Sequence, residues 1–215
     1  MAKTIGPLFS LRASQSIGGT LTYASWKGIP YVRTLVIPSN PRTTAQVNNR
    51  NVWSTLNELY KRLGTIALAP WTASVVGQPL TARNRFLQIN QPDMYDQVDM
   101  QDFTGSPGTG GAPPATSVTP SDGTGQILTL TFVTPTAPTG WTLTAVQGVA
   151  FEDGDPQGPI TPVPFEAEDA AAPLTIVLID VLAAGTFVWS GWPKWEKPDG
   201  TFAYGPSISG TQIIA

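Results

Sequence analysis

The apolar positions between residues 45 and 63 recur at spacings of three, four and seven, which is the pattern of one buried helix face. The stripe ends at Gly64, and Asn40 and Pro41 are suited to the N-cap and the first helical position. The sequence therefore predicts a helix over 45–63. Its apolar stripe consists of Ala45, Val52, Trp53, Leu56, Leu59, Tyr60 and Leu63.

Residues 20–23 and 31–37 are rich in β-branched and aromatic residues, and Lys27-Gly28 between them is a turn signal. This pattern predicts a β-hairpin. Two shorter apolar segments, 71–76 and 80–89, predict two further helices. A hairpin with two or three helices makes an α+β module.

The rest of the chain has the pattern of short strands without a helical period. Asp199-Gly200 is the turn signal of a closing hairpin. We expect an all-β sandwich of the immunoglobulin or fibronectin type here. Its strands are predicted at 127–132, 141–151, 174–179, 186–195 and 201–214.

Residues 104–125 consist almost entirely of Gly, Pro, Ser, Thr and Ala, with Val118 as an apolar exception. Such a composition buries too little apolar area to offset chain ordering. The sequence therefore predicts an α+β anchoring module over 1–103, a linker over 104–122 and a sandwich over 123–215.

The amino-acid composition excludes several kinds of catalytic and metal-binding site. The 215 residues include no His and no Cys. The side chain that most often transfers protons near neutral pH is therefore missing, as are thiolate nucleophiles, thiolate metal sites and disulfides. No apolar run approaches the length that spans a bilayer, and residues 1–20 lack the apolar core of a signal peptide. We expect a soluble chain that is not exported, binds no membrane and carries no cofactor.

Charge is unevenly distributed along the chain. Residues 1–100 hold ten Lys and Arg against four Asp and Glu, and residues 101–215 hold two against eleven. All seven Arg lie between Arg12 and Arg85. Such an asymmetry suits a basic half that faces an acidic partner, although a modest charge excess is also common in small domains.

The first 90 residues contain a series of short motifs: Lys3-x-x-Gly6-Pro7-Leu8-Phe9-Ser10, Gly19-Thr20-Leu21-Thr22, Trp26-Lys27-Gly28, Tyr31-Val32-Arg33, Pro38-Ser39-Asn40-Pro41-Arg42-Thr43, Gln46, Arg50 and Pro79-Leu80-Thr81-Ala82-Arg83-Asn84-x-Phe86. In these motifs the chain resembles a family of small structural proteins of tailed bacteriophages and prophages. The resemblance implies a component of the virion, assembled in the cytoplasm of the bacterial host, but not which component.

A second resemblance concerns the last strands. The string Leu182-x-x-Gly185-Thr186-Phe187, followed by Tyr204-Gly205-Pro206-Ser207, is similar to the end of fibronectin type III modules. The three tryptophans Trp189, Trp192 and Trp195 depart from that family's pattern. Fold similarity of this kind implies architecture rather than function.

Aromatic and basic residues of the first half form the predicted partner interface, in which aromatic area is buried and cations meet an acidic surface. Alternatively, Trp26 and Tyr31 cover the helix at 45–63 and the cations are solvated. The basic residues are scattered and match no nucleic-acid-binding motif, so nucleic acid is not the expected partner. The interface residues are Trp26, Lys27, Tyr31, Arg33, Arg42, Arg50, Arg83 and Arg85.

Trp189, Trp192 and Trp195 are the candidate ligand surface, because exposed tryptophan faces stack on sugar rings. In an unbroken strand Trp192 lies on the face opposite to the other two, and Pro193 favours an irregularity there. The alternative is that at least two of the three pack in the core.

Two carboxylate clusters occur in the second half, at 152–155 and 166–169. Paired carboxylates can hydrolyse glycosides and can bind Ca²⁺. Neither cluster has the spacing of a known loop, and both read as solvated turns between strands. Gly105 to Gly111 lacks the Lys-Ser/Thr ending of a phosphate loop. We therefore expect no catalytic residue and no metal site.

The sequence thus predicts a non-enzymatic virion protein that is present in many copies and contacts other virion subunits, such as capsid decoration, cement, head fibre or tail accessory protein. The alternative is a module on the virion that recognises host-surface carbohydrate through the three tryptophans.

Overall fold

The computed structural model divides the chain into two compact units, residues 1–42 (unit 1) and 43–215 (unit 2). The structure describes residues 2–3, 15–37, 39–40, 42–95, 97, 99–123, 127–158, 162–170, 174–180 and 184–215. None of the helices within these ranges combines the length and apolarity needed to cross a bilayer. The fold is α+β and contains a β-sandwich, as the sequence predicts at that level.

Unit 1 is a small antiparallel sheet with the strand order β1-β4-β3-β2. The predicted hairpin is confirmed, because β3 and β4 pair over their whole length on either side of Lys27-Gly28. Both turn residues have positive φ, 49° and 79°, as a two-residue hairpin turn requires. The strands are β1 (Ala2–Lys3), β2 (Gln15–Ile17), β3 (Leu21–Trp26) and β4 (Ile29–Thr34).

Unit 2 begins with three helices: α1 (Thr44–Arg62), α2 (Thr65–Ser74) and α3 (Ala82–Met94). The long helix is confirmed, although its N-cap is Thr43 rather than Asn40. Pro41, predicted for the first helical position, lies outside the described residues. The second helix starts at Thr65, six residues earlier than expected, with Gly64 as its N-cap, and it includes Pro70.

In the described part of the chain after α3, eight strands form two sheets. The small sheet has the order β5-β6-β9, and the large sheet has the order β11-β10-β7-β8 with β12 also paired to β10. The strands are β5 (Ser117–Gly123), β6 (Ile127–Val133), β7 (Thr142–Glu152), β8 (Phe165–Asp169), β9 (Thr175–Asp180), β10 (Gly185–Glu196), β11 (Phe202–Tyr204) and β12 (Ile208–Ile214).

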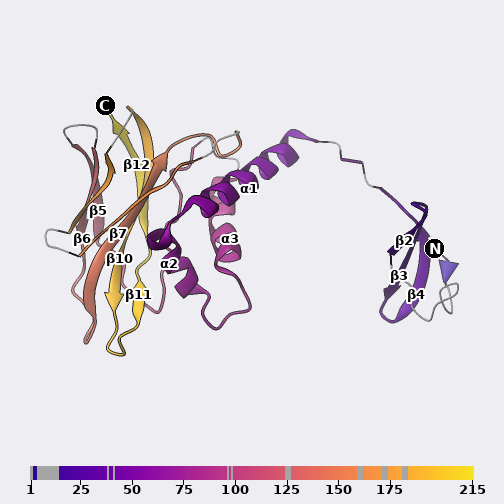
Figure 1. Ribbon diagram of the computed structural model, residues 1–215, viewed down its shortest axis with the longest axis horizontal. Coiled ribbons are helices and arrows are strands. Elements are labelled where there is room, and N and C mark those ends of the chain that lie inside the picture. The colour runs from indigo at the N-terminus through magenta and orange to yellow at the C-terminus, as the bar shows by residue number, and fades with distance from the viewer. Residues whose placement is uncertain are drawn as a thin grey trace. The chain divides into compact units, whose positions relative to one another are not determined.

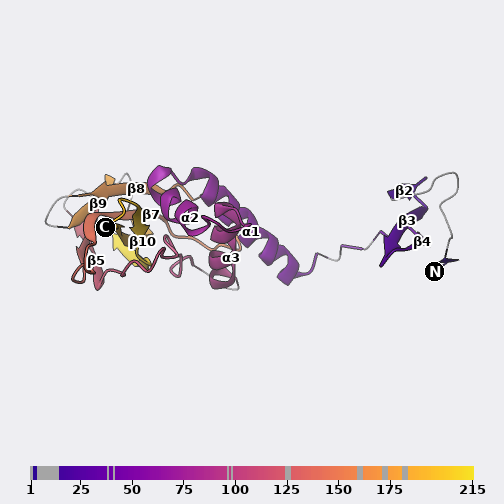
Figure 2. The same ribbon diagram turned by 90° about the horizontal axis from the view of Figure 1, so that it is seen from below.

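Within unit 2 the large sheet lies between two layers (Figures 1 and 2). The small sheet covers one face and the helices cover the other. β7 and β10 are consequently buried along most of their length. Gly148 and Gly191 face each other in the register of these strands, and a Cβ on either would lie 2.6 Å or 2.7 Å from Ile176 or Phe132 of the small-sheet layer. The glycine pair therefore lets the two sheets approach closely.

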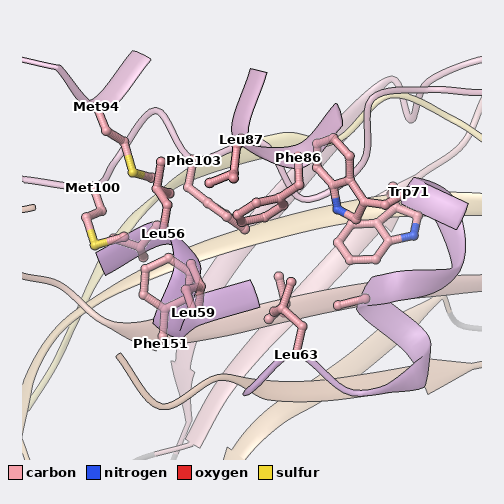
Figure 3. Close-up of a cluster of buried hydrophobic side chains, with 14 of the residues drawn as sticks. Leu56, Leu59, Leu63, Trp71, Phe86, Leu87, Met94, Met100, Phe103 and Phe151 are labelled. Atoms are coloured by element: carbon pink, nitrogen blue, oxygen red, sulfur yellow. The ribbon is translucent and has the colours of Figure 1, made fainter. Parts of the chain in front are cut away.

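The helix layer is held to the large sheet by a chain of aromatic rings centred on Phe86 (Figure 3). The ring of Phe86 lies 5.1 Å from that of Trp71, 5.3 Å from Tyr60 and 6.0 Å from Phe103. Phe103 in turn meets Phe151 of β7 edge to face at 5.0 Å. Pairs at these distances and tilts stabilise beyond their buried area. The helices and the sandwich therefore share one core.

The segment predicted as a linker, 104–122, is instead part of unit 2. The buried amide of Asn90 accepts from the Thr104 N–H at 2.8 Å and donates to the Thr104 carbonyl at 3.2 Å. The buried Ser190 hydroxyl accepts from the Gly105 N–H at 3.0 Å. Residues 117–123 form β5. The segment needs little apolar area of its own, because its polar backbone is satisfied by side chains of other elements.

The predicted division into 1–103 and 123–215 therefore differs from the observed one. The boundary lies between Arg42 and Thr43, and the three helices belong with the sandwich. Their apolar stripes pack against β7 and β10 through Phe151 and Trp192. Amphipathic periodicity shows that a helix has a buried face but does not identify the surface that buries it.

Candidate functional site

The sheet of unit 1 has two chemically different faces. Side chains of directly paired residues in antiparallel strands point to the same face. The pairs Thr22 with Arg33, Ala24 with Tyr31 and Trp26 with Ile29 define one of them. We call it the basic aromatic face, and its large side chains on β3 and β4 are Trp26, Ile29, Tyr31 and Arg33. The opposite face of β3 and β4 carries no charged residue and consists of Leu21, Tyr23, Ser25, Pro30, Val32 and Thr34.

Apolar area on the basic aromatic face is left open to solvent. Trp26 is 65% exposed and Ile29 is 47% exposed. Arg33 is exposed and Tyr31 is partly buried. The Lys27 ammonium group lies 5.0 Å from the centre of the Trp26 ring, which places a cation at the hairpin tip.

No side chain of unit 1 is buried among those described from residue 16 to residue 42. A sheet normally buries at least one face against another layer. A segment of about 40 residues also seldom has enough core to be stable by itself. The described side chains of unit 1 therefore leave both faces of the sheet without an enclosed core.

The predicted interface residues are divided between the two units. Trp26, Lys27, Tyr31, Arg33 and Arg42 belong to unit 1, whereas the remaining three lie on helices of unit 2: Arg50, Arg83 and Arg85. The Arg83 guanidinium donates two hydrogen bonds to Asn57 Oδ1, at 2.6 Å and 2.9 Å, and Arg85 donates to Gln88 Oε1 at 3.1 Å. Arg83 and Arg85 thus have structural contacts within the helix layer.

The candidate ligand surface is not a surface. Trp189, Trp192 and Trp195 are all buried, so none of them can stack on a sugar. Trp189 packs between the two sheets, and Trp192 packs against the helices and donates from Nε1 to Gln147 at 2.9 Å. Trp195 donates to the Pro113 carbonyl at 3.0 Å. The prediction of a ligand surface is therefore corrected in favour of core packing, with Trp189 and Trp192 on opposite sheet faces as their spacing predicts.

Carboxylates of both acidic clusters accept hydrogen bonds that connect separate elements. Asp153 Oδ1 accepts from the Met100 N–H at 2.9 Å. Glu166 accepts from the N–H groups of Gly64 and Ala67, so it lies at the N-terminus of α2, where a negative charge is stabilising. Among the described residues, no three metal-ligating side chains are grouped in a way that would hold an ion.

Glu168 of β8 is connected to side chains of two other strands of the large sheet, β7 and β10. It accepts from Lys194 at 2.9 Å and from Gln147 at 3.0 Å. Burial acts to raise the pKa of the Glu168 carboxyl, but the hydrogen bonds from Lys194 and Gln147 outweigh it, so the pKa is lowered. Gln147 also accepts from Trp192, so a polar chain runs from the buried strand to a surface ion pair.

A shallow apolar groove on α2 has no counterpart among the predicted sites. It is lined by Thr65, Leu68, Ala69, Thr72, Ala73, Val76 and Tyr204. Residues 63–82 contain no charged side chain, which is the sequence signal that marks this region.

No protein-family model matches the chain, and no curated protein matches it. A solved structure described as a computer-based redesign of a β-sandwich protein is similar to part of it, with 12% identity and a TM-score of 0.34. The match covers 48% of this chain and 91% of that one.

Proposed function

We propose that this chain is a non-enzymatic structural protein of a tailed-bacteriophage particle, anchored to other virion subunits by unit 1. Capsid decoration or cement and head or tail accessory protein are the roles that fit an anchored body. The particle would be assembled in the cytoplasm of the bacterial host and would carry the chain in many copies.

One observation carries this proposal: unit 1 buries none of its described side chains from residue 16 onward and exposes Trp26 and Ile29. A sheet of this kind gains its second layer by docking onto another surface. The resemblance of residues 1–90 to phage structural proteins points to the same conclusion. Relative to the sequence-based prediction, the proposed anchor is reduced from residues 1–103 to unit 1.

The acidic side chains of unit 2 accept hydrogen bonds that connect its elements, which supports a structural rather than a catalytic role. Asp153, Glu166 and Glu168 each accept hydrogen bonds from groups that connect separate elements. Catalytic carboxylates need room for a substrate between them. These three are committed to holding the helix layer and the strands together.

We also propose that the sandwich of unit 2 is of the immunoglobulin and fibronectin type. The support is the strand order. If β5, β6 and β9 are A, B and E, they form one sheet, and β7, β10 and β12 take the places of C, F and G in the other. β8 pairs with β7 as an added C′ strand does.

The direct test is to purify particles of the phage that encodes this chain on a density gradient and to quantify the chain by mass spectrometry against the major capsid protein. We expect a fixed ratio that survives repeated banding. A chain found only in the soluble fraction of the lysate would contradict the proposal.

A further inference from the structure

The two units carry net charges of opposite sign. Residues 1–42 contain five Lys and Arg and no Asp or Glu, whereas residues 43–215 contain seven Lys and Arg and all fifteen acidic residues. The units therefore carry formal charges of +5 and −8. Every acidic side chain of the molecule lies outside the unit that exposes the basic aromatic face.

We infer that the basic aromatic face docks onto an acidic protein surface on a subunit of the particle; this inference rests on the proposed function. Arg33 and Lys27 pair with carboxylates of that subunit, while Trp26 and Ile29 pack on apolar groups between them. Complementary charge gives such a contact its orientation and its selectivity. The uncharged face on the other side of the sheet carries no group that would select an acidic surface.

The composition of the face favours protein over nucleic acid. Tryptophan, tyrosine and arginine are the residues enriched at the centres of protein interfaces, and Trp26, Tyr31 and Arg33 lie together here. Interfaces with nucleic acid are far more densely positive. Ile29, which is 47% exposed and lies beside Trp26 at the hairpin turn, has no role in a phosphate contact but does in an apolar one.

A second copy of unit 1 does not suit this face. Two such faces would bring Arg33 and Lys27 of one copy against the same cations of the other, since unit 1 offers no carboxylate to pair with them. Like charges opposed at an interface are strongly disfavoured. The occupant must therefore supply the negative charge.

The test compares particles assembled with the full-length wild-type chain, with Arg33→Glu and with Arg85→Glu, and measures copies of the chain per particle by mass spectrometry. The two substitutions change the net charge equally, but Arg85 lies on α3 of unit 2, where it bonds to Gln88. We expect Arg33→Glu to reduce occupancy by about tenfold or more, because it places like charges together. Arg85→Glu should keep wild-type occupancy.

Trp26→Ala, which leaves the charge unchanged, should also lower occupancy. Arg33→Lys, which keeps the positive charge, should have most of the wild-type occupancy. The unfolding curve of each purified variant, which depends on the core of unit 2, checks that unit 2 is folded. Equal occupancy of wild type and Arg33→Glu would overturn the inference while leaving the proposed function intact.

Three further outcomes would each overturn the inference, for different reasons. Equal loss with Arg85→Glu would show a general charge effect and overturn the inference. Wild-type chain on DNA-filled but not on DNA-free particles would identify the genome as the partner and also overturn it. Absence of the wild-type chain from all particles would overturn the proposed function itself, and with it this assignment of the partner.

Discussion

The sheet of unit 1 and the large sheet of unit 2 are both antiparallel, but they differ in how far their side chains are buried. β7 and β10 are buried between the small sheet and the helices, and the large aromatic residues Phe151 and Trp192 are fully enclosed. In unit 1 none of the described side chains from 16 to 42 is buried. Unit 2 therefore has its own buried cores, whereas the described side chains of unit 1 form a surface without a core.

The strongest test of this difference is to remove one aromatic ring from each unit. Phe86→Ala should lower the free energy of unfolding of unit 2 by about 3 to 5 kcal/mol, because the cavity lies where three other rings meet. Trp26→Ala should change it by less than about 0.5 kcal/mol, since its ring is mostly in solvent. Denaturation by urea, followed by circular dichroism, measures both. Equal losses would show that Trp26 belongs to the core of the molecule.

The second test asks whether the Gly- and Pro-rich segment belongs to unit 2. Asn90→Ala removes the amide that pairs both backbone groups of Thr104, and each group left unpaired in a buried site is costly. We expect a loss of about 2 kcal/mol, together with faster hydrogen exchange at Thr104 and Gly105. Gln88→Ala, on the exposed side of the same helix, is the control. Unchanged exchange in Asn90→Ala would favour a tethered linker after all.

The contrast between the units also shows what the sequence could and could not predict. Helix α1 and the hairpin at Lys27-Gly28 follow from local patterns, the 3.6-residue period and a two-residue turn, and both are confirmed. The parity of Trp189 and Trp192 likewise placed them on opposite faces. These features depend on neighbours along the chain.

The features that were missed depend on residues far apart in sequence. Asn90 and Ser190 lie 14 and 85 residues from the backbone groups they bind, so composition alone made 104–122 a linker. The helix stripes likewise did not reveal that β7 and β10 would bury them. Of the candidate site, the sequence identified the aromatic and basic residues but could not assign them to two units.

A third, smaller effect concerns the acidic residues that only unit 2 possesses. Glu166→Ala removes the carboxylate at the N-terminus of α2 and should lower the stability of unit 2 by about 1 kcal/mol. Glu152→Ala, an exposed carboxylate at the end of β7, is the matched control and should have little effect. Urea midpoints at pH 7 distinguish them. Equal midpoints for both variants would mean that these acidic side chains contribute to the net charge of unit 2 and not to its stability.

The smallest expected effect concerns the pH dependence of stability, in which the two units differ. Unit 1 has no carboxylate or imidazole side chain, so acid acts on the side chains of unit 2. The pKa of Glu168 is lowered in the folded state; burial opposes this, and the hydrogen bonds from Lys194 and Gln147 outweigh it. A lowered folded-state pKa gives stability that is present above the unfolded-state pKa and is lost as the pH falls through the folded-state pKa.

Glu168→Gln should therefore reduce stability at pH 7 by less than about 1 kcal/mol, because the pair with Lys194 is partly exposed to solvent. The difference from wild type should shrink as the pH falls below the folded-state pKa, where wild-type Glu168 is also uncharged. Urea unfolding between pH 7 and pH 3 measures this convergence, with Glu152→Gln as the control that should follow wild type throughout. A difference that stays constant with pH would assign the effect to packing of the Glu168 side chain rather than to its charge.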